Sequence, residues 1–169
     1  MSSDADLPLI PSDGYVRISD GGTLVVEDFY EDGTFKASGI TRDQMTRQKF
    51  KKRGKGYALR QVEDQDVQWS LELHLCGFSG GTNGTVLDAF RGKNAWAAAV
   101  STSAAFGDVP TLKVEFFART SDLGAAADAV LAMKYCAADI EVSEGVPGKL
   151  ALSGEAYVFG SDPDSITID

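Results

Sequence analysis

The amino-acid sequence predicts a mainly β domain, a β-sandwich or half-barrel flanked by one short α-helix. Apolar and polar residues alternate along most of the chain, turn-forming residues separate the alternating segments, and helical periodicity is almost absent. The 169 residues are 43% hydrophobic and 24% charged, a balance typical of one globular domain with a sizeable core. We therefore expect residues 1–169 to form a single domain.

The alternation is clearest in the segment 67–75. Its odd-numbered positions are apolar and its even-numbered positions are polar, so one face of this strand is expected to be buried and the other wet. The apolar positions are Val67, Trp69, Leu71, Leu73 and Leu75. The polar positions are Gln68, Ser70, Glu72 and His74.

Weaker alternation predicts further strands on both sides of that segment. They are residues 15–18, 22–30, 34–40, 57–62, 96–102, 111–119, 129–143 and 148–159. Turn residues such as Asp20-Gly21 and Pro147-Gly148 separate these segments. Residues 1–13 and 160–169 are polar arms that contain prolines, and we expect them to run over the surface or to dock on a neighbouring molecule.

One short helix is expected at residues 85–91. Thr85 is a suitable N-cap, apolar residues follow on one side, and Gly92 is suited to end the helix. A second helical candidate begins at Gly124 and is rich in alanine. The β-branched and aromatic residues that follow favour a strand in the second half of that segment.

The segment 41–56 is a long, charged connection between two predicted strands, whereas hairpin loops usually have ~2 to 5 residues. Seven basic residues and one acidic residue, Asp43, give positions 42–55 a net charge of +6. Because the whole chain carries −9, the rest of it carries −15. The basic residues are Arg42, Arg47, Lys49, Lys51, Lys52, Arg53 and Lys55.

Three interpretations of this basic segment stay open. It is a solvated insertion, a nucleic-acid contact, or a docking element for another copy of the chain. Met45 and Phe50 argue against a role in solvent alone, because a solvated loop has little use for them. Aromatic residues interleave the cations only at Phe50 and Tyr57, and the acidic remainder repels phosphate. The charge separation therefore favours self-assembly, in which the basic segment meets the acidic remainder of a second copy.

The sequence offers no catalytic constellation, so we expect neither enzymatic activity nor a cofactor or metal. His74 is the single histidine, and it lies on the wet face of a strand. Cys76 and Cys136 have no CxxC or CxxH spacing and are expected to be reduced structural thiols. The glycine-rich segment 77–84 lacks the Gly-Lys-Ser/Thr ending of a phosphate-binding loop.

Hydropathy and charge point to the cytosol as the place of synthesis and residence. No apolar run approaches the ~20 residues of a transmembrane helix, so no membrane insertion is expected. The N-terminal segment is acidic and interrupted by prolines, unlike a secretory signal peptide. The net charge of −9 disfavours broad affinity for nucleic acid or anionic membrane.

The order of these features resembles a known family. An acidic N-terminus, a strand pair, a long charged loop, the alternating strand RQVEDQDVQWSLELHL and the short helix in TVLDAFRGKNAW are followed by VSEGVPGKLALSGEAYVFG. Over about residues 14 to 159 this order resembles the major tail tube protein of long-tailed, siphovirus-like bacteriophages. Small signposts are a Leu-Asp pair before Trp96 and Glu144-Gly145 before the closing strand.

The resemblance implies a β-sandwich whose inner sheet joins those of five neighbours into a ring-wide β-barrel. Such hexameric rings stack helically into a hollow tube, assembled in the host bacterial cytoplasm and carried in the virion tail, through which DNA is ejected. The family has no cofactor and no catalysis. Its partners are copies of itself and the tape measure, distal tail and terminator proteins, and DNA passes without specific binding. No appended immunoglobulin-like domain is expected.

The resemblance also implies roles for two sets of residues. The family's long loop reaches the adjacent ring, and in this sequence it corresponds to residues 41–56. The inter-ring candidates are Arg42, Met45, Arg47, Lys49, Phe50, Lys51, Lys52, Arg53 and Lys55. Because a lumen that passes DNA should repel phosphate and offer no stacking surface, the wet face of 67–75 is the candidate lumen lining. Its residues are Gln68, Ser70, Glu72 and His74.

Two alternatives remain at this point. The first is an inner-tube protein of a contractile or secretion-type injection machine, which shares the fold and differs in its partners. The second is a monomeric β-sandwich or barrel that binds a carbohydrate or another small ligand. That second alternative predicts a concave aromatic patch, for which Trp69 and Trp96 are the available tryptophans, and the alternation places Trp69 in the core instead.

Overall fold

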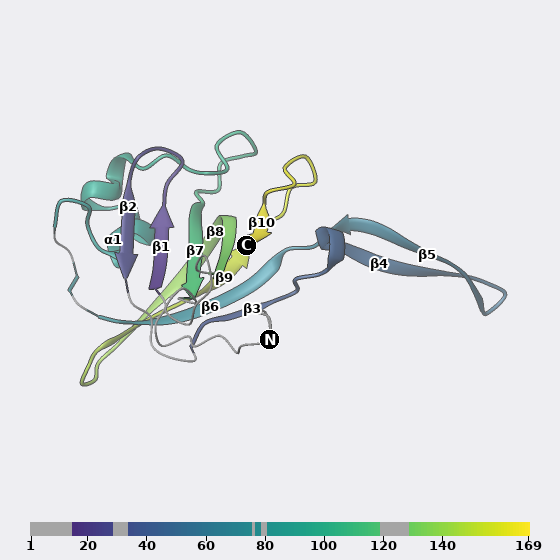
Figure 1. Ribbon diagram of the computed structural model, residues 1–169, viewed down its shortest axis with the longest axis horizontal. Coiled ribbons are helices and arrows are strands. Elements are labelled where there is room, and N and C mark those ends of the chain that lie inside the picture. Colours follow the sequence, from purple (N-terminus) through teal and green to yellow (C-terminus); the bar gives the residue numbers. More distant parts are fainter. Residues whose placement is uncertain (1–14, 29–33, 76, 79–80, 119–128) are drawn as a thin grey trace, which may run out of the picture.

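The computed structural model describes residues 15–28, 34–75, 77–78, 81–118 and 129–169. The described chain is mainly β with one short α-helix, as the sequence predicts (Figure 1). The strands are β1 (Tyr15–Ser19), β2 (Val25–Asp28), β3 (Lys36–Ser38), β4 (Met45–Lys52), β5 (Lys55–Asp64), β6 (Val67–His74), β7 (Leu112–Ala118), β8 (Ala129–Ser143), β9 (Lys149–Ala156) and β10 (Ile166–Ile168). The helices are α1 (Val86–Arg91) and the 3₁₀ helices η3 (Arg42–Gln44) and η4 (Asn94–Ala98).

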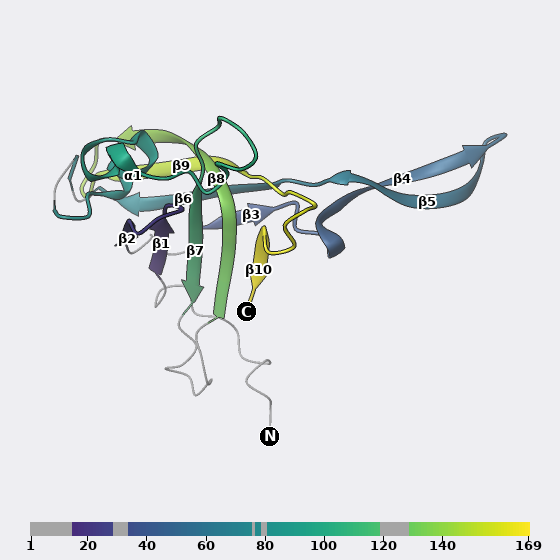
Figure 2. The same ribbon diagram turned by 90° about the horizontal axis from the view of Figure 1, so that it is seen from above.

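Eight strands form one antiparallel sheet in the order β2-β1-β7-β8-β9-β6-β3, with β10 added on β8. The long strand β8 divides this sheet into two parts. Its first half pairs with β7 as far as Cys136, and its second half pairs with β9 from Cys136 to Ser143. In Figure 2, β7 and the first half of β8 run across the direction of β6 and β9. The two parts therefore pack as a β-sandwich that shares one bent strand.

The core lies between the two parts of the sheet and beneath α1. Both tryptophans belong to it, because Trp69 is 3% exposed and Trp96 is 1% exposed. The predicted alternation is confirmed for β6, since its odd-numbered residues are buried and its even-numbered residues are exposed or half-buried. Leu75, just after the strand, is half-buried. The other large core residues are Val16, Ile18, Val67, Leu71, Leu73, Val86, Leu87, Leu112, Val114, Met133, Leu150 and Leu152.

Helix α1 begins and ends at the predicted residues. The Thr85 hydroxyl accepts a hydrogen bond from the backbone N–H of Asp88, and the Asp88 carboxylate accepts one from the backbone N–H of Thr85, both at 3.2 Å. This reciprocal pair satisfies two N–H groups that the first turn leaves without partners. Gly92 ends the helix in the left-handed conformation, with φ of 59°.

The strand predicted at 96–102 is wrong. Residues 94–98 instead form η4, and an irregular segment follows. Alanine occupies four of the five positions from Ala95 to Ala99, and alanine has a low preference for strands. Trp96 points inward, and its Nε1–H donates to the carbonyl oxygen of Asn83 at 2.7 Å. The buried indole therefore fixes the path of this segment.

The two terminal arms have different outcomes. Residues 1–13 lie outside the described residues. In the arm 160–169, the strand β10 pairs with Leu131–Met133 of β8, and Ser165 is buried. The C-terminal arm thus docks on its own chain and extends its own sheet. The helical candidate that begins at Gly124 lies outside the described residues up to position 128, and β8 begins at Ala129 as expected.

The charge of the segment 41–56 suggested an irregular loop, but the structure shows a hairpin there. Strands β4 and β5 pair antiparallel and form a long hairpin that projects from the sandwich in both views (Figures 1 and 2). Arg53 and Gly54, with φ of 49° and 80°, form the two-residue turn at its tip, as a type I′ hairpin turn requires. The sequence analysis did not predict β4, because charged residues occupy both faces of this strand and it therefore lacks the alternation of a half-buried strand.

Candidate functional site

Two features of the fold are candidates for function: one wet sheet face and the projecting hairpin. The wet face belongs to the four-stranded part of the sheet formed by β3, β6, β9 and the second half of β8. We call it the polar face. The predicted lumen residues Gln68, Ser70, Glu72 and His74 lie on it side by side along β6.

Strand register extends this face well beyond β6. In β9, the residues opposite the four polar residues of β6 are Glu155, Ser153, Ala151 and Lys149. In β8, the next residues across are Ala137, Asp139, Glu141 and Ser143. In β3, Ser38 and Lys36 pair with Gln68 and Ser70. These fourteen register positions are small or hydrophilic and include no Phe, Tyr or Trp. The sequence alternation predicted this pattern for β6 only.

The polar face carries a small excess of negative charge. Its carboxylates are Glu72, Asp139, Glu141 and Glu155, and its amines are Lys36 and Lys149, so the formal net charge is −2. The Lys149 amine lies 3.7 Å from a Glu72 carboxylate oxygen, and both side chains are more than 40% exposed. Because water screens this pair, it contributes little to stability and leaves both charged groups accessible to solvent.

At one end of the polar face a tyrosine lies beside carboxylates. The Gln68 amide donates to the Glu155 carboxylate at 2.8 Å, next to Tyr157. Burial raises the pKa of the Tyr157 hydroxyl, and the nearby carboxylates of Glu155 and Asp66 raise it further. The phenol therefore stays neutral at physiological pH. A pocket of about 430 Å³ lies here, bordered by Gln68, Asp139, Ser153, Glu155 and Tyr157.

The second feature is the β4–β5 hairpin, whose strands pair only with each other among the residues that the structure describes. An isolated two-stranded hairpin is at best marginally stable in water, so this arm lacks the support that a second layer would give. Phe50 lies opposite Ala58 and is half-buried, and Met45 at the base is also half-buried. Most other positions are exposed, and Leu59 is an apolar residue with 71% exposure.

The hairpin concentrates positive charge. Between positions 46 and 62 there are seven Lys or Arg residues and no Asp or Glu. Within the described chain, no ion pair joins these seven cations to a carboxylate. They are Arg47, Lys49, Lys51, Lys52, Arg53, Lys55 and Arg60. The sequence analysis placed Arg60 in the predicted strand 57–62 and not in the basic segment. A hairpin turn at Arg53-Gly54 would have indicated that Arg60 belongs to the same hairpin as the other cations.

The remaining predicted cation, Arg42, belongs to the base of the hairpin in η3 and lies 3.9 Å from Asp43. Gln44 holds this base together. Its side-chain amide donates to the carbonyl oxygens of Gly39 at 2.7 Å and Gln65 at 2.8 Å, and its oxygen accepts from the backbone N–H of Thr41. Because these bonds join the chain entering the hairpin to the chain leaving it, they fix the direction of the arm.

The described residues contain no group of three side chains suited to hold a metal ion. Cys136 is buried, and burial raises the pKa of its thiol, so this cysteine stays protonated and unreactive. Cys76 lies outside the described residues. Within the described part of the chain, no helix has the length and hydropathy needed to cross a bilayer.

Both tryptophans are buried, so neither forms the exposed aromatic platform expected of a carbohydrate-binding module. The candidate site therefore consists of the polar face and the hairpin.

Comparison with known proteins finds no relative: no family model matches the chain, and no curated protein or solved structure matches it.

Proposed function

We propose that this chain is the subunit of a hollow tube, a virion structural protein of the tail tube type that passes DNA during ejection from a long-tailed bacteriophage. The observation that carries the proposal is the polar face, a wide and slightly acidic sheet surface whose reverse side is the hydrophobic core. In this proposal six copies form a ring, and the polar face of each copy lines the lumen.

The chemistry of the polar face suits a conduit for DNA. Proteins hold DNA mainly by neutralising phosphates with Lys and Arg, and they hold single strands by stacking bases on aromatic rings. The register positions of this face carry more carboxylates than amines and no Phe, Tyr or Trp side chain. DNA that passes such a wall meets weak repulsion and no binding site, so it slides without being held.

Ring closure is supported by two open sheet edges. Within the described chain, β3 pairs with β6 on one side only, and no strand pairs with the second half of β8 on the side opposite β9. Exposed edges invite pairing with other chains. If the β8 edge of one copy pairs with the β3 edge of the next, the four-stranded sheets join into a closed barrel that leaves neither edge exposed.

The projecting hairpin supplies the contact between rings in this proposal. It extends beyond the sandwich and carries charge opposite to that of the rest of the chain, so it reaches a neighbouring copy rather than its own body. Partners of the finished tube are the tape measure, distal tail and terminator proteins. The tube assembles in the bacterial cytoplasm and resides in the virion, and the subunit requires no cofactor and catalyses no reaction.

The test is negative-stain electron microscopy of the concentrated full-length protein, with sedimentation velocity on the same samples. The proposal predicts hollow tubes or stacked rings with sixfold end views. A chain that sediments as a monomer at every concentration, also in the presence of a crowding polymer, would contradict it and would favour a monomeric binding module.

A further inference from the structure

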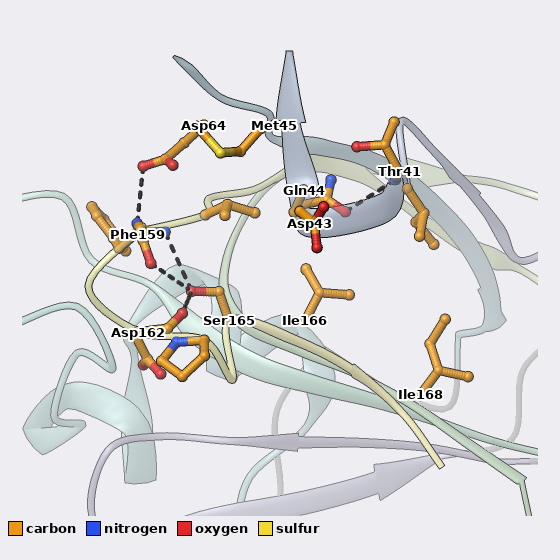
Figure 3. A pocket seen from close by; sticks show the side chains of 14 residues that line it. Thr41, Asp43, Gln44, Met45, Asp64, Phe159, Asp162, Ser165, Ile166 and Ile168 are labelled. Atoms are coloured by element: carbon orange, nitrogen blue, oxygen red, sulfur yellow. Dashed lines mark hydrogen bonds between the residues drawn. The ribbon is translucent and has the colours of Figure 1, made fainter. Parts of the chain in front are cut away.

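A pocket of about 600 Å³ lies at the base of the β4–β5 hairpin, between η3 and the C-terminal segment that follows β9 (Figure 3). Much of its wall is apolar. Ile166 lies at its centre, and Ile40 and Ile168 border it with 40% and 67% of their surfaces exposed. Large apolar side chains with this exposure, gathered around one hollow, indicate a surface that another molecule covers.

The same pocket is acidic. Asp43, Asp64 and Asp162 line it, and none of the described residues that border it is Lys or Arg. Asp162 already forms an ion pair within the chain, because the Lys134 amine lies 2.6 Å from its carboxylate. Asp64 accepts a hydrogen bond from the backbone N–H of Gly160 at 2.9 Å and has no cation beside it in the described chain. A carboxylate has about four acceptor positions, so Asp64 keeps the capacity to bind a cation.

Asp43 has similar spare capacity, and it lies beside Gln44 on the η3 side of the pocket (Figure 3). It accepts a hydrogen bond from the side-chain amide of Gln61 at 3.0 Å, and Arg42 lies 3.9 Å away with 89% of its side chain exposed. That solvent-exposed pair is weak. The pocket therefore combines an apolar wall with two carboxylates that can each receive an amine from outside the chain.

The tip of the hairpin has the complementary chemistry. Four cations surround the turn: Lys51, Lys52, Arg53 and Lys55. Leu59 of β5 is exposed and lies opposite Lys49 of β4. The tip and the pocket lie at opposite ends of the same arm (Figures 1 and 2), so the tip does not reach the pocket of its own chain. Because the acidic pocket lies at one end of the arm and the basic tip at the other, the two can meet only if they belong to different copies.

We propose that the hairpin tip of one copy docks in the hairpin-base pocket of a second copy. The amines of the tip face Asp43 and Asp64, and Leu59 packs against Ile40 and Ile168. The contact is heterologous, since each copy offers a tip and a pocket, and it repeats along an open series of copies rather than closing on a pair. The inference rests on the proposed function, and it names the surface that receives the hairpin in the next ring.

Charge reversal on both sides tests the pairing. The tip variant is Lys51→Glu, Lys52→Glu and Arg53→Glu, the pocket variant is Asp43→Lys with Asp64→Lys, and a third protein combines all five changes. Asp108→Lys with Glu144→Lys is the control for the pocket variant, because it also replaces two carboxylates with two amines, at exposed sites outside the tip and the pocket. Circular dichroism and urea unfolding verify that each variant is folded before its assembly is measured.

The measured quantity is the critical concentration for tube formation, by pelleting and negative-stain microscopy. Each single-sided variant is expected to raise it at least about tenfold, since opposed like charges at an interface cost several kcal/mol. The combined variant is expected to recover most of that loss, and the control is expected to behave as the wild type. Normal tubes from the pocket variant, or no recovery in the combined variant, would overturn the inference.

A second measurement keeps the inference testable if a charge variant folds poorly. Benzoylphenylalanine in place of Leu59 is irradiated in a mixture of ¹⁴N- and ¹⁵N-labelled full-length chains, and mixed-label cross-links are mapped by mass spectrometry. Cross-links to segments 40–45 or 158–168 support the docking, whereas cross-links to other segments alone overturn it. Wild-type protein that forms no tubes at all rejects the proposed function itself, so the two failures are distinguishable.

Discussion

Gly154 of β9 lies against the backbone of Ala137 in β8 so closely that a Cβ atom on Gly154 would collide with the Ala137 carbonyl oxygen. Trp69 of β6 pairs with the same glycine on the other side. Because the obstacle is backbone rather than a flexible side chain, the two strands must separate to admit any side chain. This approach lies in the middle of the sheet that carries the polar face.

Replacing Gly154 with alanine is therefore expected to destabilise the fold by about 1 to 3 kcal/mol, the usual range for overpacking. The measurement is the free energy of unfolding in urea. Ser153→Ala is the matched control, because Ser153 is adjacent, exposed and free of such a contact, and it should change stability by less than about 0.5 kcal/mol. Equal stability of Gly154→Ala and the wild type would show that the sheet is less tightly closed here.

The N-cap of α1 gives a second stability prediction. Thr85→Ala removes the hydroxyl that accepts from the backbone N–H of Asp88, and it should cost about 1 kcal/mol. Thr85→Ser keeps the hydroxyl and should stay close to the wild type. Thermal unfolding is a sufficient measurement, since 1 kcal/mol corresponds to about 2–4 °C in Tm for a chain of this size. An identical Tm for the alanine and serine variants would contradict the role of the cap.

Acid is expected to weaken the link between β8 and the C-terminal segment. The hydrogen bond from Lys134, and after it that from Tyr135, lowers the pKa of Asp162 below its ordinary value of 3.8. A carboxyl with a lowered folded-state pKa stabilises the fold fully above the unfolded-state value. That stabilisation is lost as the pH falls from about 4 through the lower pKa of the folded state.

The measurement compares urea unfolding of wild type and Asp162→Asn between about pH 6 and about pH 2.5. The wild type should be the more stable protein at the upper end, and the difference should shrink below about pH 4. Asp164→Asn, two residues away and exposed, serves as the control. A stability difference that does not depend on pH would show that Asp162 acts through packing alone.

Glu72→Lys tests the lumen assignment. The substitution places an additional amine beside Lys149 on the polar face. In the proposed hexameric ring it is repeated six times in every layer of the tube. Tubes should still form, whereas DNA ejection from particles that carry the variant should slow, and added salt should relieve the delay. Glu72→Gln removes the charge without adding a cation and is the control. Normal ejection through Glu72→Lys tubes would place this face away from the DNA.

Much of the sandwich could be predicted from the sequence, because burial on one face leaves a clear period. In β6, Trp69 and Leu71 alternate with Ser70 and Glu72, and the observed exposure follows that alternation. Helix α1 was recognised from its ends, since Thr85 and Gly92 have conformational roles that few residues fill. In both elements, chemistry within a few residues determines the local structure.

The hairpin and η4 could not be predicted in the same way. Strand β4 has no buried face, so the sequence shows no alternation there, and in the described part of the chain the strand pairs with β5 alone. The inward turn of Trp96 depends on the carbonyl oxygen of Asn83, a contact that no local pattern reveals. The width of the polar face depends on register between β6, β9 and β8, and the pocket beside Asp64 depends on a C-terminal segment distant in sequence.

The central claim is that copies of this chain form a ring with the polar face inside. The most direct measurement is electron cryomicroscopy of tubes assembled from the purified full-length protein, at a resolution that traces the strands. The account predicts six copies per ring, with the second half of β8 paired with β3 of the adjacent copy and Glu72 and Glu141 facing the lumen. A tube whose polar face points outward, or a ring closed through other strands, would contradict it.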